Sequence, residues 1–366
     1  MTGLQLEPVD TWFFRDGTPF TMGVAPQEGV GSLFPPHPPT VAGALRAALA
    51  RGHGWGGRGR WPREVCNVLG DGPDTLGMIS FDGPFLLRCG QPLFRVPRHI
   101  VGSANAHGWK PSSFLRPGDP VACDLGSHRL PEVLSKDHDE TETQGTGNDY
   151  WLTRDGVDSA LSGCLPPAGT IVPARTLWSD EPRIGLRRTA ARTAEEGMLY
   201  STRHVRPVRG VGLGVLLSGL PNHWGIPSGK MLPFGGESRL AACREWRGDV
   251  RFDPSLDRIA ETGRAALIAL SPLDLEQEML RGHRALNGPE GFRVVSACLD
   301  RPQRVGGWDS LARCPLPIRS VLPPGSVLFC ELSHRDRIDE RGDGLVRIGR
   351  RREWGFGLAA LGVWPE

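Results

Sequence analysis

The chain has 366 residues, of which 39% are hydrophobic, and its formal net charge is +2 at pH 7. This length can hold two domains of ordinary size, each with its own core, and the hydrophobic content is typical of a globular rather than a disordered protein. A nearly neutral charge excludes a surface that is basic throughout, so any phosphate-binding site must come from arginines that cluster locally.

The sequence shows no segment typical of export or membrane insertion. No basic stretch followed by an apolar run precedes Leu4, and no apolar run approaches the roughly 18 residues that a membrane span needs. The eight cysteines form no C-x-x-C pair, so the sequence indicates neither a zinc knuckle nor a redox dithiol. We therefore expect a cytoplasmic protein with reduced cysteines, no cofactor, no metal site and no membrane contact.

The basic residues are almost all arginine, since only Lys110, Lys136 and Lys230 are lysine. Arginine offers planar, bidentate contacts that suit phosphates and base stacking. A GC-rich genome produces the same bias, so the overall composition does not indicate a binding site and only local clusters do.

A strand and a helix joined by a proline-rich link are the first elements that we expect. Residues Leu4 to Phe14 indicate a strand that runs into the turn Arg15-Asp16-Gly17. After the link, Thr40 can cap a helix that ends at Gly52 and has apolar residues along one face. These apolar residues are Val41, Ala44, Leu45, Ala48 and Leu49.

Hairpin strands and a long insertion follow. Short apolar runs within residues 79–96 are typical of hairpin strands. From Ala104 to Tyr150 the chain is polar and interrupted by proline, so we expect an insertion whose acidic section, Asp137 to Glu142, is solvated. A metal site at residues 137–140 is disfavoured, because neighbouring carboxylates in a flexible loop repel and nothing fixes their geometry. Helical character returns at Tyr150 to Leu161.

A first cluster of arginines lies between Arg183 and Arg209. This stretch holds seven arginines and only two acidic residues, Glu195 and Glu196. It is either a basic surface that binds phosphates or a solvated hairpin. The arginines are Arg183, Arg187, Arg188, Arg192, Arg203, Arg206 and Arg209.

The second half of the chain contains further strand patterns. Apolar residues alternate from Val205 to Leu217, and residues 234–239 are typical of a turn that leads into a helix. Strands are also expected at Ala265 to Leu270, Phe292 to Cys298 and Ser326 to Leu332. Two mixed domains, split near residue 200, fit this order of elements better than one large parallel sheet.

The closing segment, Leu345 to Trp364, has the strongest functional signal. Three consecutive arginines, residues 350–352, precede Gly355 and Gly357, with Trp354 alongside. Guanidinium groups beside backbone amides that glycine leaves accessible suit a phosphate backbone, and an indole can stack a base. The alternative is a strand, a tight turn and a second strand with solvated arginines.

Motifs of nucleotide and metal chemistry are absent, since no Walker sequence, H-E-x-x-H helix, EF-hand loop or G-x-S-x-G elbow occurs. Metal-independent RNA cleavage needs an acid or base beside the 2′-hydroxyl, and His37 and His204 are the best candidates. Neither has a catalytic partner nearby in the sequence. A surface or hydrogen-bonding role is simpler, so we expect no enzyme activity and no catalytic residue.

Several segments, in order along nearly the whole chain, resemble one known family. They are LEPVDTWFFRDGTPF, FPPHPPTVAGALRAAL, EPRIGLRRTAARTAEEGMLY, GGESR and WGFGLAALG. Together they are similar to Cmr subunit three, a family of RAMP-superfamily proteins in type III-B CRISPR effector complexes. The insertion at residues 104–150 and the polar stretch at residues 335–343 lie outside the resemblance.

The resemblance implies both a fold and a role. The fold is α+β, with two ferredoxin-like, RRM-related domains that carry insertions, here residues 1–200 and residues 201–366, the second with the glycine-rich loop. The role is that of a non-catalytic, RNA-binding subunit in antiviral defence. It holds the 5′ tag of the CRISPR RNA and bridges the large polymerase/cyclase subunit to the first backbone RAMP subunit. The alternative is a RAMP-type endoribonuclease that processes precursor CRISPR RNA with His37 or His204.

Sequence and resemblance together place RNA contacts at the first turn, the first helix, an inserted hairpin and the closing glycine loop. Recognition of a short single-stranded tag needs phosphate clamps and stacking surfaces, because splayed bases expose their faces and edges. The candidate RNA-binding residues are Arg15, Arg46, Arg51, Arg187, Arg188, Arg192, Arg350, Arg351, Arg352 and Trp354.

Overall fold

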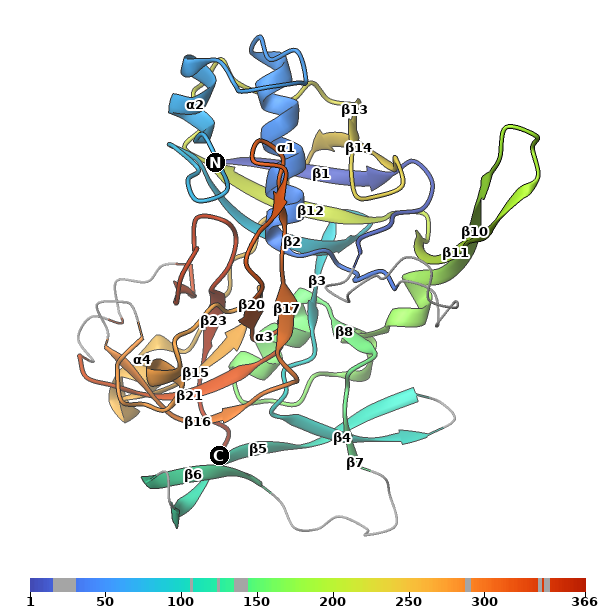
Figure 1. Cartoon of the computed structure of the whole chain (residues 1–366). Helices are drawn as coiled ribbons and strands as arrows, with labels where there is room; N and C mark the ends of the chain where they lie inside the picture. Colours follow the sequence, from blue (N-terminus) through green and yellow to red (C-terminus); the bar gives the residue numbers. More distant parts are fainter. Residues whose placement is uncertain are drawn as a thin grey trace.

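The computed structural model describes residues 1–15, 31–105, 108–123, 126–134, 144–286, 291–334, 338 and 343–366. They form a mixed α/β protein in which strands predominate, with one large sheet in the upper half of Figure 1 and another in the lower half. Within these ranges, none of the helices combines the length and the apolar character that crossing a membrane requires.

The first sheet has eight strands in the order β13-β14-β1-β12-β2-β3-β8-β9, and neighbouring strands are antiparallel. Four adjacent strands of this sheet lie in the order β14-β1-β12-β2. If these four are numbered 1 to 4 along the chain, their spatial order is 4-1-3-2. Strand pairing crosses the predicted domain boundary at residue 200, because β12 and β14 join β1 and β2 in one sheet. The strands are β1 (Thr2–Pro8), β2 (Ser80–Arg88), β3 (Gln91–Arg95), β8 (Tyr150–Leu152), β9 (Ile171–Pro173), β12 (Val211–Ser218), β13 (Lys230–Pro233) and β14 (Leu240–Glu245).

Helix α1 (Pro38–Gly52) packs against one face of the first sheet, and the shorter α2 (Arg63–Leu69) follows it. The helix ends where the sequence predicted but begins two residues before Thr40, with His37 at the cap position and no side-chain cap. Proline suits the first turn because its φ is already helical and its missing N–H would have no partner there. Leu45 and Leu49 are buried, as their spacing predicted.

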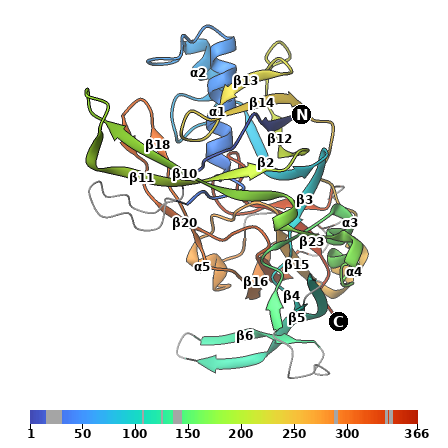
Figure 2. The same ribbon diagram turned by 90° about the vertical axis from the view of Figure 1, so that its right-hand side faces the viewer.

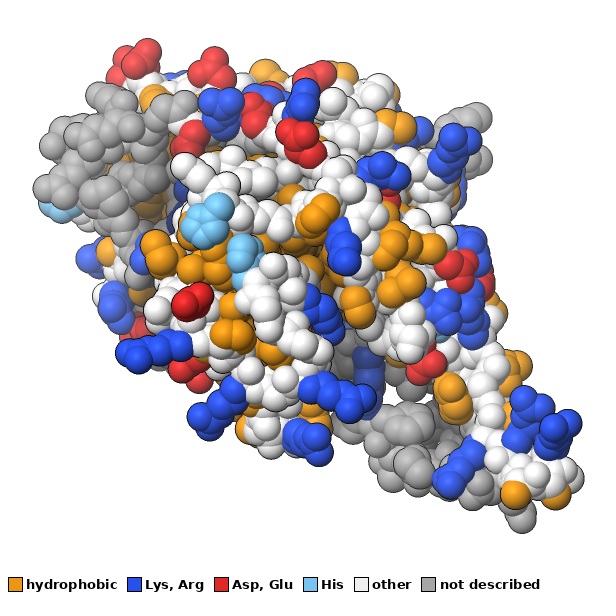
Figure 3. Space-filling model, turned by 90° about the horizontal axis from the view of Figure 1, so that it is seen from above, with side chains coloured by type: hydrophobic (Ala, Val, Ile, Leu, Met, Phe, Trp, Pro, Cys, Tyr) orange, Lys and Arg blue, Asp and Glu red, His pale blue; other side chains and the backbone are white. Residues whose placement is uncertain are grey.

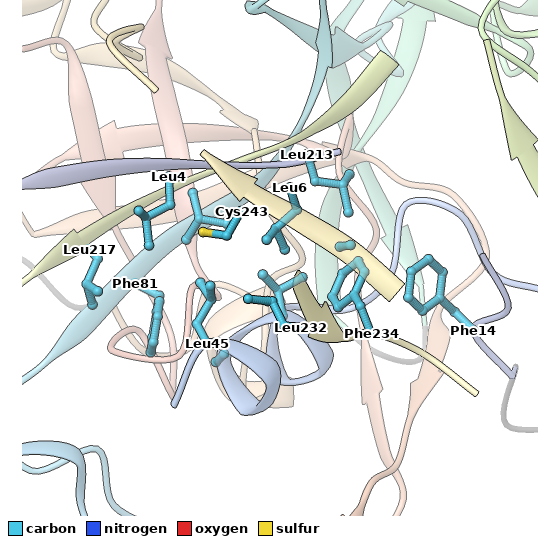
Figure 4. Packing of buried hydrophobic residues seen from close by; sticks show 14 of the residues in the cluster. Leu4, Leu6, Phe14, Leu45, Phe81, Leu213, Leu217, Leu232, Phe234 and Cys243 are labelled. Carbon is cyan, nitrogen blue, oxygen red and sulfur yellow. The ribbon is translucent and has the colours of Figure 1, made fainter. Parts of the chain in front are cut away.

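Side chains from the sheet and from α1 meet in a hydrophobic core (Figure 4). Leu4 and Leu6 of β1 point to the same side, as the two-residue period of a strand requires, and Leu45 of α1 faces them. Phe14 and Phe234 extend this core, with an edge-to-face contact of 5.0 Å between ring centroids.

The second sheet has five strands in the order β16-β21-β15-β23-β22. Read from the β23 side, four adjacent strands lie in the order β23-β15-β21-β16. If these four are numbered 1 to 4 along the chain, their spatial order is again 4-1-3-2. The strands predicted around residues 265–270, 292–298 and 326–332 are therefore confirmed. The elements of this region are α4 (Leu256–Thr262), β15 (Arg264–Ala269), α5 (Gln277–Leu280), β16 (Phe292–Cys298), β21 (Val327–Leu332), β22 (Leu345–Arg347) and β23 (Leu358–Gly362).

The two sheets share buried side chains. Leu86 of β2 belongs to the core on the α1 side, whereas its neighbours Phe85 and Leu87 belong to a cluster with Ile268 of β15 and Phe329 of β21. Because successive residues of a strand point to opposite faces, β2 is buried on both faces. The first sheet is thus enclosed by α1 on one side and by the second sheet on the other.

Two structures extend from this body (Figures 1 and 2). One is the hairpin of β10 (Trp178–Arg188) and β11 (Ala194–Pro207), which carries all residues of the first arginine cluster except Arg209. The other is a sheet in the order β6-β5-β4-β7. Much of the expected polar insertion therefore pairs as strands, because its buried Trp109 and Phe114 supply a core that no continuous apolar run signalled. The strands are β4 (Ile100–Asn105), β5 (Gly108–Cys123), β6 (Gly126–Val133) and β7 (Gln144–Thr146).

The remaining elements are short. Helix α3 (Arg154–Leu161) confirms the later part of the helical segment predicted at residues 150–161, whereas its first three residues form strand β8. Val305 and Val321 of the ribbon β17–β20 join the core on the α1 side, so this ribbon links the second half of the chain to the first. The short elements are η1 (Ala168–Thr170), η2 (Ala174–Thr176), β17 (Gln303–Val305), β18 (Trp308–Asp309), β19 (Cys314–Pro315) and β20 (Arg319–Val321).

Candidate nucleic-acid interface

Carboxylates neutralise the arginines at the foot of the β10–β11 hairpin. Asp10 accepts hydrogen bonds from Arg183 at 2.9 Å, Arg206 at 3.0 Å and Arg239 at 3.1 Å. Glu181 also binds Arg183 and Arg206. The hydrogen bond from Arg183 is the main reason that the pKa of Asp10 is lowered to about 2. These arginines fasten the hairpin to the body of the protein.

The arginines near the tip of the hairpin have a different environment. Arg188 ends β10, and Arg192 lies in the turn with a φ of +63°. Both are exposed, and neither has an acidic partner in the part of the chain that the structure describes. Arg187 is exposed as well. Figure 1 shows that the hairpin carries this tip away from the two large sheets.

The three arginines of the closing turn differ from one another. Arg350 donates from Nε and Nη2 to Oδ1 of the buried Asp274, at 3.2 and 2.8 Å. Arg351 is partly buried, which lowers its pKa. Arg352 is exposed and donates to the carbonyl oxygen of Arg347 at 3.4 Å. Of the three, Arg352 is the one that is exposed and has no carboxylate partner among the described residues.

Trp354 lies in the core and is 4% exposed. The guanidinium carbons of Arg46 and Arg351 stand 5.1 and 5.3 Å from its ring centroid. In this structure the indole therefore packs inside the protein and offers no free face on which a base could stack.

Arg46, predicted to contact RNA, is 6% exposed. Its Nε donates to the carbonyl oxygen of Leu69 at 2.9 Å, and its Nη2 donates to those of Gly72 and Thr75 at 3.1 Å each. Burial lowers its pKa to about 10. Arg46 therefore ties α1 to the loop after α2 and does not lie on the surface.

The sequence suggested that Gly355 and Gly357 leave the backbone open to a ligand. In the structure, they instead allow backbone segments to pack closely together. A Cβ atom at Gly355 would lie 2.4 Å from the carbonyl oxygen of Gly83, and one at Gly357 would lie 2.0 Å from that of Ile348. Both glycines have positive φ, +93° and +79°. The amide of Gly357 donates to the carbonyl oxygen of Pro272. Glycine is needed here for close contact between chain segments.

A cavity of about 300 Å³ lies where the two sheets meet. Its walls come from the proline-rich link before α1, from β2 and β3, and from loops of the second sheet at Leu270 and Pro323. Arg95 and Arg98, at and just after the end of β3, bring two guanidinium groups to its wall. Two carboxylates oppose their charge, since Asp300 pairs with Arg98 and Asp149 also lines the cavity.

Donor groups of this cavity are only partly satisfied. Arg98 is 7% exposed and pairs with Asp300 at 2.6 Å, but its Nε and Nη1, like Nε1 of Trp151, have no partner among the described residues. Arg95 lies over Trp151 at 4.3 Å, and burial lowers its pKa to about 10. Because buried donors without partners are rare in folded proteins, the cavity suits a ligand that carries acceptor atoms.

The two histidines considered for catalysis occupy different places. His37 lines the cavity, and burial lowers its pKa to about 4, so it is neutral at pH 7. His204 is buried, with its Nδ1 3.0 Å from Oγ1 of Thr11 and its ring stacked on Phe13. Burial also lowers the pKa of His204. His204 is thus held in a packed position that a 2′-hydroxyl cannot reach.

The other predicted positions are exposed. Arg15 forms a β-bridge with Ser32, while residues 16 and 17 of the predicted turn lie outside the described ranges. Arg51 lies at the end of α1, with its guanidinium 4.9 Å from the ring centroid of Trp55. Residues 137–140, which were considered for a metal site, also lie outside the described ranges. Within the described ranges, no group of three or more His, Cys, Asp or Glu residues could hold a metal ion.

The predicted residues therefore do not form one site. Arg46 and Trp354 are in the core, and the three arginines near the hairpin tip are on a separate arm. Arg95, Arg98 and Trp151 were not among the residues predicted from the sequence. A signal was present, because these two arginines lie in the largely apolar run of residues 93–101, and charged residues are seldom found among hydrophobic neighbours without a specific role.

Comparisons with known proteins identify the family. A family model described as "CRISPR-associated protein (Cas_Cmr3)" matches residues 4–364, and no curated protein matches the chain. The chain is similar to one in the cryo-EM structure of the type III-B Cmr-beta bound to cognate target RNA and AMPPnP, state 1, with TM-score 0.49, 18% identity, and 92% of this chain and 87% of that chain covered. A chain of the Cmr-beta structure bound to cognate target RNA has TM-score 0.47, 16% identity, and coverage of 89% and 86%. One in the crystal structure of the Csm3-Csm4 subcomplex of the type III-A CRISPR-Cas interference complex has TM-score 0.33, 10% identity, and coverage of 91% and 93%. Since the family model spans nearly the whole chain, this protein belongs to the Cmr3 family of CRISPR-associated proteins.

Proposed function

We propose that this chain is a non-catalytic, RNA-binding subunit of a type III-B CRISPR effector complex. In this role it holds the 5′ tag of the CRISPR RNA and bridges the large polymerase/cyclase subunit to the first backbone RAMP subunit. The observation that carries the proposal is family membership over residues 4–364. The complex would act in antiviral defence in the cytoplasm, where guide RNA is present.

The distribution of charge along the β10–β11 hairpin supports an RNA contact. Carboxylates neutralise the arginines at its foot, whereas Arg188 and Arg192 near its tip are exposed and have no acidic partner among the described residues. A projecting arm with uncompensated guanidinium groups can clamp phosphates. Arg352 of the closing turn is a further candidate for phosphate contact.

The cavity between the sheets supports recognition of one nucleotide of the tag. An unstacked base presents acceptor atoms on its edges, and the free donors of Arg98 and Trp151 can meet them. The carboxylate of Asp149 in the cavity wall can accept hydrogen bonds from base amino groups. A single splayed base would therefore find both kinds of partner in this cavity.

The strand orders support two ferredoxin-like units related to the RRM fold. Both sheets contain four strands arranged 4-1-3-2, and a helix follows the first strand in the upper unit. The first unit would run from β1 to β14 with residues 89–210 as an insertion between β2 and β12. The second would run from β15 to β23. This division places the boundary near residue 250 rather than residue 200.

A crosslinking experiment on the assembled complex tests the RNA-holding role. Guide RNA that carries 4-thiouridine in its 5′ tag should crosslink to this subunit, and the double variant R188A/R192A should reduce the yield. The control R247A/R251A removes the same charge from exposed arginines that pair with Glu245 and Asp249, and should crosslink like the parent. No crosslink to the parent subunit would refute the proposed role, whereas undiminished crosslinking of R188A/R192A would refute only the hairpin contact.

A cleavage assay distinguishes the proposal from the endoribonuclease alternative. We expect the purified protein to leave precursor repeat RNA intact in EDTA, because His204 is buried and neither histidine has a catalytic partner nearby in the sequence. Sustained cleavage that the substitution His37→Ala abolishes would establish the alternative.

A further inference from the structure

A basic and aromatic surface lies at the end of α1, formed by residues 51–63 together with His223 and Trp224, and is called here the Arg–Trp surface. Residues 51–63 contain four arginines and two tryptophans but no aspartate or glutamate, and residues 219–229 contain no acidic residue either. Figure 3 looks down on this end of the molecule and shows histidine and hydrophobic side chains gathered beside basic ones.

The arginines of this surface lack the carboxylate partners found at the hairpin foot and the closing turn. Arg51, Arg58, Arg60 and Arg63 are exposed, and none forms an ion pair with a described residue. The guanidinium carbon of Arg51 lies 4.9 Å from the ring centroid of Trp55. Their positive charge is therefore uncompensated, which makes an anionic partner favourable.

The aromatic rings of the surface are held in place by packing. His53 stacks on Trp224 with 3.7 Å between ring centroids and an interplanar angle of 9°. Trp55 meets Trp61 at 6.0 Å, and its Nε1 donates to the carbonyl oxygen of Arg58. These tryptophans and His53 are partly exposed. Fixed rings that reach the surface lose little entropy when a flat group stacks on them.

Two glycines of the loop are not required by the fold. A Cβ atom at Gly52 or Gly56 would meet nothing within 4 Å, and neither residue has a positive φ. The backbone is thus open on these sides, and glycine there allows a ligand to approach it closely.

We propose that the Arg–Trp surface binds single-stranded RNA without sequence preference. The arginines contact phosphates while bases stack on the tryptophan and histidine rings, the combination used by surfaces that bind single strands irrespective of sequence. An acidic protein segment could pair with the arginines, but this pairing would not account for the exposed aromatic rings or for the glycines that leave the backbone open. The inference rests on the proposed RNA-binding function but not on recognition of the tag, because this surface is separate from both the cavity and the hairpin.

Binding of a labelled 15-nucleotide oligoadenosine, which has no tag, tests the electrostatic part by fluorescence anisotropy over a range of salt concentrations. The full-length variant R58A/R60A/R63A should bind more weakly, and the slope of log affinity against log salt should fall in magnitude by about 2, since each phosphate contributes about 0.7. The control R281A/R293A/R301A removes the same charge from exposed arginines of the second-sheet region and should keep the parent slope. An equal loss in both variants would show that only net charge matters and would overturn the proposal.

The stacking part is tested at Trp55. The variant Trp55→Leu should weaken oligoadenosine binding by about 5–160-fold, which corresponds to one lost stacking contact, and Trp55→Phe should recover most of the loss because it keeps an aromatic face. Melting curves confirm that both variants are folded. Parent-like binding by folded Trp55→Leu would overturn stacking at this position.

Two further outcomes separate the possible partners. If R58A/R60A/R63A binds oligoadenosine like the parent but no longer co-purifies with the other subunits, the surface is a protein interface and the RNA proposal is wrong. A parent that binds guide RNA but not oligoadenosine overturns this inference and leaves the proposed function intact. A parent that binds neither overturns both.

Discussion

Arg46 and Arg352 carry the same guanidinium group in opposite environments. Arg46 donates to three carbonyl oxygens inside the protein, whereas Arg352 is exposed at the closing turn. Trp354, between Arg46 and Arg351, is a core residue in a segment that otherwise has the composition of an RNA site. At the scale of residues, a side chain's burial decides whether it serves the fold or the surface.

Replacing Trp354 with alanine should destabilise the protein by about 3–5 kcal/mol, because it leaves a large cavity in the core and removes a ring that contacts Arg46. Urea denaturation measures the change. The matched control Trp308→Ala removes an indole that is 61% exposed and should stay within about 0.5 kcal/mol of the parent. If Trp354→Ala is as stable as the parent but retains RNA less well, Trp354 is part of the RNA site and not of the core.

Arg350 and Arg352 should respond differently to substitution by alanine. Arg350→Ala leaves the carboxylate of Asp274, which is 1% exposed, without its cation, so we expect a loss of about 1.5–3 kcal/mol. Arg352→Ala removes an exposed group and should change stability by less than about 0.5 kcal/mol. Thermal melting compares the two variants, and equal stabilities would contradict the structural role of Arg350. Only the Arg352 variant can then report on RNA binding without a change in the fold.

At the scale of elements, the β10–β11 hairpin is an arm whose foot is held by ion pairs. Asp10 contacts Arg183, Arg206 and Arg239, which lie on β10, on β11 and in the segment before β14. One carboxylate after β1 thus connects three parts of the chain. Near the tip, Arg188 and Arg192 are exposed and have no acidic partner in the described part of the chain, which leaves them available to a partner.

This network should make stability depend on acid pH. The pKa values of Asp10 and Glu181 are lowered in the folded protein, so their contribution is complete above the unfolded pKa of about 4 and is lost as the pH falls toward about 2. The variant Asp10→Asn should therefore be less stable than the parent at pH 7 and nearly equal to it at pH 2. The difference is small because the side chains are partly exposed to solvent. Melting temperatures at pH 2–7 measure it, and a difference that does not change with pH would contradict the prediction.

At the scale of the whole molecule, the two large sheets behave as one packed unit. Phe85 and Leu87 of the first sheet share a cluster with Ile268 and Phe329 of the second, and Val305 and Val321 bring the second half of the chain to the α1 side. The cavity lined by Arg95 and Arg98 is formed by both sheets together, because its walls include β2 and β3 of the first sheet and loops of the second.

Thermal unfolding should therefore show a single transition, because neither sheet can lose its structure without exposing apolar side chains of the other. Calorimetry tests this by comparing the calorimetric enthalpy with the van't Hoff enthalpy, which should agree for a cooperative unit. Two resolved transitions would show that the sheets unfold independently.

Local patterns in the sequence were sufficient for several features of the protein. An apolar stripe after the proline-rich link predicted α1, and short apolar runs predicted β15, β16 and β21, because helix and strand periodicity depends on near neighbours. Five sequence motifs, which follow one another along nearly the whole chain, also indicated the family. The clustering of Arg187, Arg188 and Arg192 was visible because the three lie close together in the sequence.

Only the tertiary structure decided which of these side chains reach solvent. The pairing of β1 with β12 joins residues about 200 positions apart, and no local pattern specifies such a partner. The burial of Arg46 and Trp354 and the meeting of Arg98 with Trp151 in one cavity depend on the same long-range contacts. Residue types that suit RNA were therefore evident from the sequence, whereas their roles followed from packing, because burial is set by chain segments that are distant in sequence.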